Sequence, residues 1–168
     1  MIRRLLPADA DAVLRLRHEA LEREPLAFSS SPAEDRVQVP GVLEEYLAQQ
    51  TKAIFGAFEP DLIGMAGIVQ EEGVKSRHKA RLWGVYVAPS SRGAGIGRAL
   101  VAAAIEFARS LDGLTHVHLA VAESGRGAQA LYVHLGFTTW GTEPAAMRVG
   151  DVSVPEHHMV LALRPGAA

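Results

Sequence analysis

The chain has 168 residues, of which 48% are hydrophobic and 21% are charged, a balance typical of a folded globular domain rather than of a disordered chain. Lysine plus arginine number 17 and aspartate plus glutamate 19, so the formal net charge is -2 and nucleic acid is disfavoured as the main partner. The absence of cysteine excludes disulfide frameworks, thiolate metal sites and cysteine-nucleophile mechanisms, and it fits a reducing compartment.

The sequence shows no segment that would direct the chain to a membrane. Residues 1–6 begin like a signal peptide, but Pro7, Asp9 and Asp11 interrupt any apolar run. The longest uncharged stretch, residues 127–142, is too polar to span a bilayer. We therefore expect a soluble, cytoplasmic protein with no membrane partner.

Turn residues and hydrophobic periodicity divide the chain into helices and strands. In chain order, the sequence predicts a strand at 2–6, a helix capped by Asp9, a helix at 41–50, strands at 53–58, 62–69 and 81–88, a long helix after 97, a strand at 117–121, a short helix at 127–135, and strands at 137–142 and 158–163. Hairpin turns are expected at 59–61 and near 150–151, and Gly84 inside a strand indicates a β-bulge or the close approach of a ligand. This order favours a mixed α/β sheet with helices on its faces, and no linker or repeat divides the chain.

A glycine-rich turn carries the strongest chemical signal. It leads into the long helix, and it holds Gly93, Gly95 and Gly97 between Arg92 and Arg98. Glycines allow positive φ and let backbone N–H groups converge, and the N-terminus of the following helix adds the positive end of its dipole. The turn therefore predicts an anion site of the kind that holds a pyrophosphate. The plainer interpretation is a tight strand–helix connection in which glycine only relieves crowding.

Neither common nucleotide fingerprint fits this turn. A Walker loop requires Gly-Lys followed by Ser or Thr, and the turn contains no such sequence. The dinucleotide fingerprint requires a third glycine three residues after the second, and that position is Arg98 or Leu100 depending on the register. Glycine spacing thus argues against a nucleotide-binding protein.

Two motifs resemble a known family. The pattern Arg92-x-x-Gly95-x-Gly97 at the start of a helix resembles the acetyl-CoA motif of the GCN5-related N-acetyltransferases, the GNAT family. Residues 128–137, AQALYVHLGF, are similar to the family's Ala-x-x-Leu-Tyr-x-x-x-Gly-Phe segment. The strand at 82–87 followed by Pro89 also resembles the family's fourth strand, and the order of elements agrees along nearly the whole chain.

The resemblance implies an α/β fold with a single N-acetyltransferase domain over residues 1–168 and an acetyl-CoA-binding core at about 80–137. The sheet would be mixed, mostly antiparallel and splayed, flanked by helices, with acetyl-CoA between the strands at 85–87 and 117–121. The residues implied to contact the cofactor are Val85, Tyr86 and Val87 at the pantetheine arm, Arg92, Gly93, Ala94, Gly95, Ile96, Gly97 and Arg98 at the pyrophosphate, and Ser124, Gly125 and Tyr132 farther along. Gly125 stands where the family often has an Asn, and Ser124 is the candidate replacement for that contact.

Tyr132 is the catalytic residue that the resemblance implies, as the proton donor to the departing CoA thiolate. The absence of cysteine and of a Gly-x-Ser-x-Gly elbow favours direct attack of an amine on the thioester in a ternary complex. A backbone N–H near Val85, exposed by the irregularity at Gly84, is the candidate donor to the developing oxyanion. The alternative is that Tyr132 is a core residue packed beside Leu131 and Leu135.

The general base is left open by the sequence. A lysine acceptor with a pKa of about 10.4 is only about one part in a few thousand neutral at pH 7, whereas an α-amine near about 7.8 is deprotonated far more easily. Some family members place a glutamate on the fourth strand, and Arg81 stands in roughly that position here. The candidate replacements are Glu71, Glu72, His78, His118 and Glu123, of which Glu123 comes first because it ends the strand that faces the cofactor cleft. Each of them is better explained as a solvated charge or a surface histidine.

The histidines do not predict a metal site. His116 and His118 share one face of a predicted strand, but no carboxylate stands at ligand spacing and no His-Glu-x-x-His occurs. We expect structural histidines and no metal, with acetyl-CoA as the acetyl donor.

Acceptor recognition is expected from the loop at 26–38, the helix at 41–50 and the hairpin region at 143–157. The candidate pocket residues are Phe28, Tyr46, Trp140 and Met147, of which Tyr46 and Met147 are better explained as core. Glu44 and Glu45 would suit a cationic acceptor, although an exposed helix face explains them as well. The expected partner is a small-molecule or peptide amine, and the sequence does not choose among such amines.

Two further expectations concern assembly and class. The resemblance makes a homodimer possible, with Trp140 and the final hairpin as its interface. The alternative function is a non-catalytic acyl-CoA-binding sensor or regulatory module, which would retain residues 92–97 but need neither Tyr132 nor an acceptor cleft. The presence of Tyr132 favours the enzyme.

Overall fold

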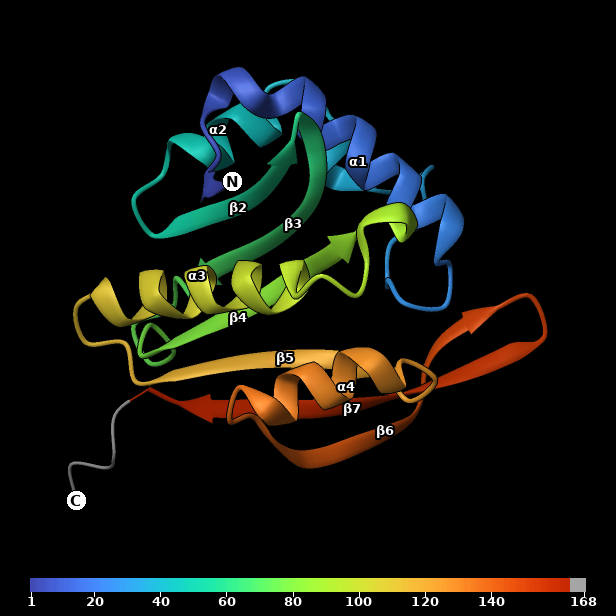
Figure 1. The fold of residues 1–168 in the computed structure, drawn as a ribbon. Coiled ribbons are helices and arrows are strands. Elements are labelled where there is room, and N and C mark those ends of the chain that lie inside the picture. Colours follow the sequence, from blue (N-terminus) through green and yellow to red (C-terminus); the bar gives the residue numbers. More distant parts are fainter. Residues whose placement is uncertain (164–168) are drawn as a thin grey trace.

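The computed structural model describes residues 1–163, so the last residues of the predicted domain, 164–168, lie outside the described part. The strands are β1 (Ile2–Arg4), β2 (Lys52–Glu59), β3 (Asp61–Gln70), β4 (Lys79–Val87), β5 (His116–Ala122), β6 (Thr138–Val149) and β7 (Val152–Ala162). The helices are α1 (Ala10–Arg23), α2 (Val42–Ala48), α3 (Ile96–Ser110) and α4 (Arg126–His134), with 3-10 turns at Pro7–Asp9, Arg36–Gln38 and Pro89–Ser91. The order of strands and helices is the predicted one (Figure 1).

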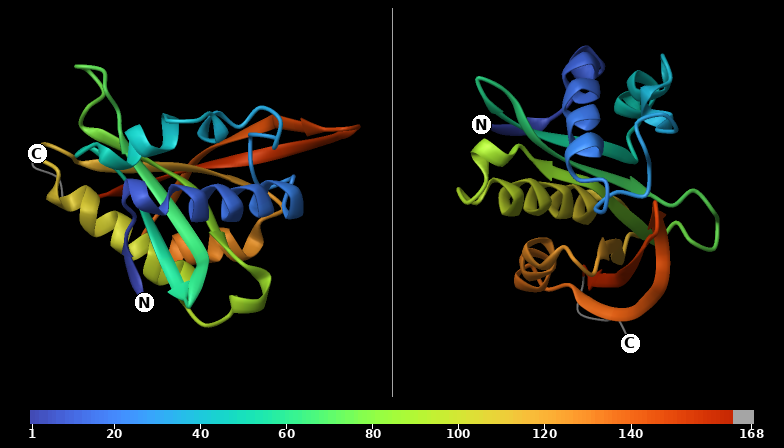
Figure 2. Two further views of the ribbon diagram at one scale, coloured as in Figure 1. Left: turned by 90° about the horizontal axis from the view of Figure 1, so that it is seen from above. Right: turned by 90° about the vertical axis from the view of Figure 1, so that its right-hand side faces the viewer.

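The strands form one seven-stranded sheet in the order β1-β2-β3-β4-β5-β7-β6. Every neighbouring pair is antiparallel except β4 and β5, which run parallel. Different helices cover its two faces: α3 and α4 pack on one face, and α1 and α2 pack on the other (Figure 2). The predicted mixed, mostly antiparallel α/β sheet flanked by helices is confirmed.

The sheet opens between its two parallel strands. β4 and β5 are paired only where Lys79, Ala80 and Arg81 face the start of β5. Beyond that point β5 continues its pairing with β7 alone, and the two strands separate toward their C-terminal ends (Figure 1). The second half of β4 therefore has backbone groups on this side that no strand satisfies, which is where a ligand with amide groups can pair.

A β-bulge lies at the start of this unpaired segment. Met65 of β3 faces Tyr86 and Gly67 faces Trp83, so Gly84 and Val85 together oppose one residue of β3. Gly84 has a φ of 61°, a conformation that disfavours side chains with a Cβ. The bulge predicted from Gly84 is confirmed. It directs Val85 toward the core under α3 and α4, whereas Tyr86 packs in the core under α1 and α2.

The start of α1 differs from the expectation. Asp9 is the residue before the helix, but its carboxylate does not cap the helix. It instead accepts hydrogen bonds from the Leu6 amide at 2.8 Å and from the Arg3 guanidinium at 2.7 and 2.8 Å. The capping prediction is wrong because a charged partner across the turn competes with the helix N–H groups for the same oxygens.

The final hairpin is longer than predicted. The strands expected at 137–142 and 158–163 are the inner parts of β6 and β7, which continue to a tight turn at Gly150 and Asp151, as predicted for that turn. Figure 1 shows this outer part projecting beyond the sheet. Pro144, Pro155 and a register shift between Glu143 and Met147 disturb the alternation there, which is why the pattern does not reveal it.

None of the helices within residues 1–163 combines the length and apolarity needed to cross a bilayer.

Candidate functional site

A cavity of about 750 Å³ lies at the open end of the sheet, where β4, the glycine-rich turn and α4 meet. Its walls are formed by Glu24, Ala27, Phe28, Val85, Tyr86, Val87, Ser91, Arg92, Gly93, Gly95, Ile96, Gly97, Arg98, Ser124, Gly125, Arg126, Gly127, Ala128, Leu131 and Tyr132. The structure thus brings together every residue predicted to contact the cofactor except Ala94, although these residues span nearly 50 positions of sequence in about 85–132.

Two glycines of the glycine-rich turn adopt a left-handed backbone conformation. Gly93 and Gly95 have φ values of 85° and 77°, which side chains with a Cβ rarely adopt. Within the described residues, no heavy atom beyond the chain neighbours lies within 4 Å of the place a Cβ would take at either position. Relief of crowding therefore does not explain these glycines, whereas the required backbone conformation does.

Gly97 differs from its two neighbours. It lies in the first turn of α3 without a positive φ, and the nearest atoms to an added Cβ would be Val87 Cγ2 at 3.7 Å and Leu131 Cδ1 at 3.8 Å. Those are ordinary contacts, so the fold itself would accept alanine. A glycine inside a helix is less stable than alanine by about 1 kcal/mol. Its bare backbone at the cavity wall is therefore better explained by the approach of a ligand.

Arg92 is held in place by contacts with two distant elements. Its Nε donates to the Val87 carbonyl at 2.9 Å, and its Nη2 donates to Glu24 Oε1 at 2.8 Å. The guanidinium carbon also lies 5.6 Å from the centre of the Tyr86 ring. These contacts join the predicted pyrophosphate turn to the end of α1. Sequence reasoning missed Glu24, because its partner lies 68 positions away.

Tyr132 packs in the core and also lines the cavity. Its side chain is 6% exposed and meets the Phe137 ring edge-on at 5.8 Å. Burial raises the pKa of Tyr132 above its usual range, so the phenol stays protonated at neutral pH. Within residues 1–163 its hydroxyl has no hydrogen-bond partner, which leaves the proton free for a ligand.

The turn after β5 is fixed by Gln129. The Gln129 amide donates to the carbonyls of Ala122 and Glu123, each at 2.9 Å, and the Gly125 amide donates to Ala122 at 2.9 Å. These bonds hold Ser124 and Gly125 at the cavity wall. The Glu123 side chain is exposed, and it is not among the residues that line the cavity.

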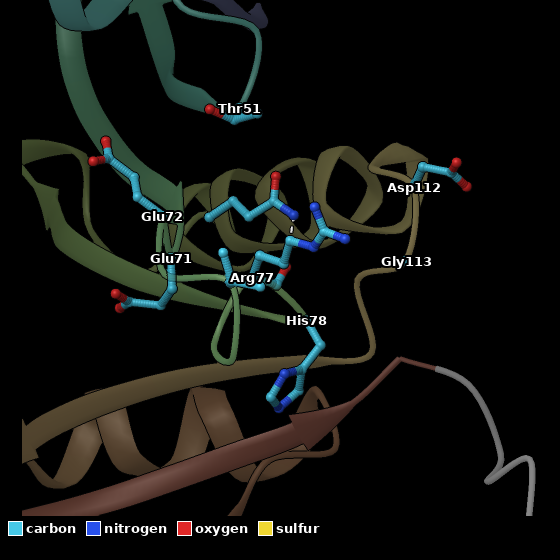
Figure 3. Close-up of a pocket in the computed structure, with 9 residues that line it drawn as sticks. Thr51, Glu71, Glu72, Arg77, His78, Asp112 and Gly113 are labelled. Atoms are coloured by element: carbon cyan, nitrogen blue, oxygen red, sulfur yellow. Dashed lines mark hydrogen bonds between the residues drawn. The ribbon is translucent and has the colours of Figure 1, made fainter.

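Three of the other candidate bases lie far from this site. Glu71, Glu72 and His78 line a second cavity of about 870 Å³, beside the loop that precedes β4 (Figure 3). This loop is at the opposite end of β4 from the glycine-rich turn. His118 faces Arg81 where the pairing of β4 with β5 ends, and burial followed by nearby cationic groups lowers the pKa of His118. His118 is therefore neutral at physiological pH.

The residues predicted to contact the acceptor lie in different places: one lines the cavity, one is in the core, and one is on the surface. Phe28 lines the cavity, with its ring edge-on to Tyr86 at 6.4 Å. Tyr46 belongs to the core, because its hydroxyl donates to the Ile68 carbonyl and accepts from Trp83 Nε1, each at 2.8 Å. Trp140 lies on β6 with 63% of its surface exposed.

Beside the cavity lies a polar pair that sequence reasoning did not find. Arg17 and Asp35 are both 6% exposed, and Arg17 Nε donates to Asp35 Oδ2 at 3.0 Å. Tyr86 also donates its hydroxyl to Glu19 at 2.9 Å. No local pattern marks these partners, because each pair joins different elements. In the part of the chain that the structure describes, no three histidine, aspartate or glutamate side chains are grouped so that they could hold a metal ion.

Comparison with known proteins assigns the family. A model described as the acetyltransferase (GNAT) family matches residues 14–137, and the chain belongs to this family. It is 45% identical over 64 residues to a mycothiol acetyltransferase of Salinispora tropica, a match that covers 36% of this chain and 21% of the relative. The chain thus spans about a fifth of the length of that curated relative.

Solved structures show the same fold. The putative acetyltransferase YncA of Salmonella typhimurium, solved with its cofactor acetyl-CoA, superposes with a TM-score of 0.87 at 21% identity, over 100% of this chain and 96% of that one. The ribosomal-protein-alanine N-acetyltransferase of Brucella melitensis superposes with a TM-score of 0.84 at 25% identity, over 96% and 99% of the two chains.

Proposed function

We propose that this protein is an N-acetyltransferase that moves an acetyl group from acetyl-CoA to a primary amine by direct attack in a ternary complex. The observation that carries the proposal is the cavity at which the unpaired half of β4, the turn at Gly93 and Gly95, and the N-terminus of α3 converge. Its single domain is residues 1–168, with the cofactor-binding core at about 80–137.

The pyrophosphate of acetyl-CoA would lie on the backbone N–H groups of residues 92–98. The first N–H groups of a helix have no partner within the helix, and the dipole of α3 favours a negative charge there. Arg98 is exposed at the cavity wall and adds positive charge. Gly97 lets the phosphates approach the backbone closely, and Ala94 contributes only its amide.

The pantetheine arm would run back along β4 from this turn. Val85 and Val87 offer backbone groups that β5 does not satisfy, and their side chains pack toward the cavity side of the sheet. The Tyr86 side chain packs in the core under α1 and also borders the cavity, with its ring 6.4 Å from that of Phe28. Ser124 and Gly125 close the opposite wall.

The reaction needs one proton removed and one supplied. The neutral amine attacks the thioester carbonyl carbon, the new C–N bond forms, and the C–S bond breaks with its electron pair on sulfur. The Val85 N–H at the bulge donates to the oxyanion, and the Tyr132 hydroxyl donates its proton to the thiolate. Glu123, reached through water, remains the proposed base for the proton lost by the amine.

The partners and location follow from the same proposal. The acceptor is a small-molecule or peptide amine, the protein acts in the cytoplasm, and two copies can pair through Trp140 and the final hairpin. The rival function, a non-catalytic acyl-CoA sensor, would need no free proton donor at the cavity. The unpartnered hydroxyl of Tyr132 within the described residues therefore favours the enzyme.

A thiol-release assay tests the proposal. The protein is mixed with acetyl-CoA and a broad amine panel, free CoA thiol is measured, and acetyl-CoA binding is measured by calorimetry. Amine-dependent thiol release is expected. Binding without release for any amine would favour the sensor, and absence of binding would refute the assignment of the cavity.

A further inference from the structure

Arg17 is a buried cation that the proposed reaction leaves without a role. Arg17 and Asp35 are the buried charged residues in the described part of the chain. Arg17 Nε and Nη2 donate to the two carboxylate oxygens of Asp35 at 3.0 and 3.3 Å. The pair attaches the loop after α1 to α1 itself, but it uses only one edge of the guanidinium.

The second edge of the guanidinium faces the bulge of β4. Arg17 Nη1 lies 3.6 Å from the position that a Cβ would take at Gly84. The guanidinium carbon lies 5.3 Å from the centre of the Phe28 ring and 5.7 Å from that of Trp83. Aromatic rings therefore flank the cation, and a side chain at Gly84 would stand directly in front of Nη1.

The N–H groups of Nη1 have no hydrogen-bond acceptor among the described residues. Among residues 1–163 the hydrogen bonds of the Arg17 side chain go to Asp35 alone, and 7% of the side chain remains accessible. In the described residues Nη1 is not among the fully buried side-chain atoms that lack a partner, so it keeps some contact with solvent. A donor that contacts water can exchange that water for a ligand oxygen. Arg17 Nη1 is therefore placed to donate a hydrogen bond to an oxygen of a ligand.

That oxygen is best supplied by the acceptor, an argument that rests on the proposed function. In that proposal the pantetheine arm would run from the turn at 92–98 back along Val87 and Val85, and the thioester would then lie near Gly84. α3 and α4 cover one face of β4 there, and α1 with Phe28 covers the other. Phe28 and Tyr86 line the cavity from the side of α1, and the Arg17 guanidinium carbon lies 5.3 Å from the centre of the Phe28 ring. An amine that enters past Phe28 therefore comes near Arg17.

We propose that Arg17 is a specificity-determining residue that binds a carbonyl oxygen on the carbon next to the acceptor amine. The preferred acceptors are then α-amino carbonyl compounds, whether free amino acids with a carboxylate or amino-acid amides and peptide N-termini with a neutral carbonyl. Asp35 already balances the charge of Arg17, so the site recognises the oxygen itself rather than requiring an anion.

The carboxylates around the site are consistent with this class. Glu24 is the single acidic side chain among the described residues that line the cavity, and it is paired with Arg92. Glu19 is occupied by the Tyr86 hydroxyl and Arg23. A peptide α-amine with a pKa near about 7.8 is about one part in seven neutral at pH 7, so it depends on a base far less than a lysine side chain does.

The test compares acceptors matched in side chain. Each set contains an amino-acid amide, the free amino acid, and the amine that lacks the carbonyl group, and kcat/KM is measured by thiol release for each. The variants are Arg17→Lys, which keeps a charge beside Asp35 but loses the second edge of donors, and Asp35→Asn, which leaves the guanidinium unbalanced. Arg15→Lys, on the exposed face of the same helix, is the matched control.

Wild type and Arg15→Lys are expected to prefer the α-carbonyl acceptors. Arg17→Lys should lose about tenfold or more in kcat/KM for them, as expected for a charged hydrogen bond, while the carbonyl-free amines change less than about twofold. Asp35→Asn should raise the kcat/KM for the free amino acid several-fold relative to the kcat/KM for the matching amide. Acetyl-CoA affinity and melting temperature are measured alongside, to show that the cofactor site and the fold persist.

Three results would overturn the inference. They are a wild-type preference for carbonyl-free amines, an equal loss for all acceptors in Arg17→Lys, and an unchanged carboxylate-to-amide ratio in Asp35→Asn. The wild-type comparison decides the matter even if a variant fails to fold. Absence of thiol release with every amine would instead refute the proposed function, so the two failures are distinguishable.

Discussion

Replacing Tyr132 by Phe isolates the proposed proton donor. The ring and its edge-on contact with Phe137 at 5.8 Å are kept, and only the hydroxyl is lost. General acids typically contribute about 10²–10⁴ in rate, and the CoA thiol, judged by the pKa of about 8.5 of free cysteine, is a good leaving group that needs little help. We therefore expect kcat to fall about 100-fold, equivalent to about 2.7 kcal/mol of transition-state stabilisation.

Tyr132→Phe should lower turnover without lowering the free energy of unfolding or the affinity for acetyl-CoA. The Tyr132 hydroxyl has no partner in the described residues, so its removal should change the free energy of unfolding by less than about 0.5 kcal/mol. The acetyl-CoA dissociation constant should stay within about twofold. Because burial raises the pKa of Tyr132, kcat of the wild type should not decline up to about pH 10, since the donor form persists below the raised pKa.

Tyr46→Phe is the matched control. It removes a buried hydroxyl that bonds Ile68 and Trp83, so it should cost about 1–3 kcal/mol of stability and leave kcat nearly unchanged. The assays are steady-state thiol release, calorimetry with acetyl-CoA, and thermal unfolding. If Tyr132→Phe keeps kcat within about threefold of wild type, or if its affinity falls as much as its turnover, the role of the hydroxyl as the acid is refuted.

The other predictions concern the turn and the N-terminus. Gly97→Ala should raise stability by about 0.5–1 kcal/mol while weakening acetyl-CoA binding at least tenfold, and calorimetry showing unchanged affinity would contradict the close approach of phosphate. Gly95→Val should abolish binding because the 77° φ is strained for a β-branched residue, and wild-type affinity would rule out this turn as the phosphate site. The hydrogen bond from Arg3 lowers the pKa of Asp9, so this carboxylate stabilises the fold above its unfolded pKa and loses that effect as pH falls through the folded pKa. Asp9→Asn should therefore reduce stability to urea at pH 7 and flatten its decline below about pH 4, whereas a decline equal to that of wild type would show that Asp9 has no such role.

Much of the fold could be predicted because its signals are local. The apolar face of α3, the turn residues of the hairpins, and Gly84 at the bulge each depend on neighbours within a few positions, which fix backbone conformation through sterics and periodicity. The motif at 92–97 and the segment at 128–137 were recognisable for the same reason. The outer part of the final hairpin was missed, because two prolines and a bulge disturb its alternation.

The sequence by itself determined the conformation of the glycine-rich turn and the order of the elements, since both depend on backbone preferences of adjacent residues. Only the tertiary structure decided which charges meet: Arg17 with Asp35, 18 positions apart, and Arg92 with Glu24, 68 positions apart. The residues next to an arginine in sequence do not reveal its ion-pair partner. An ion pair depends on the distance between the two groups in space, and that distance is set by how the elements pack. The same packing separated Glu71, Glu72 and His78 from the cavity at the other end of β4.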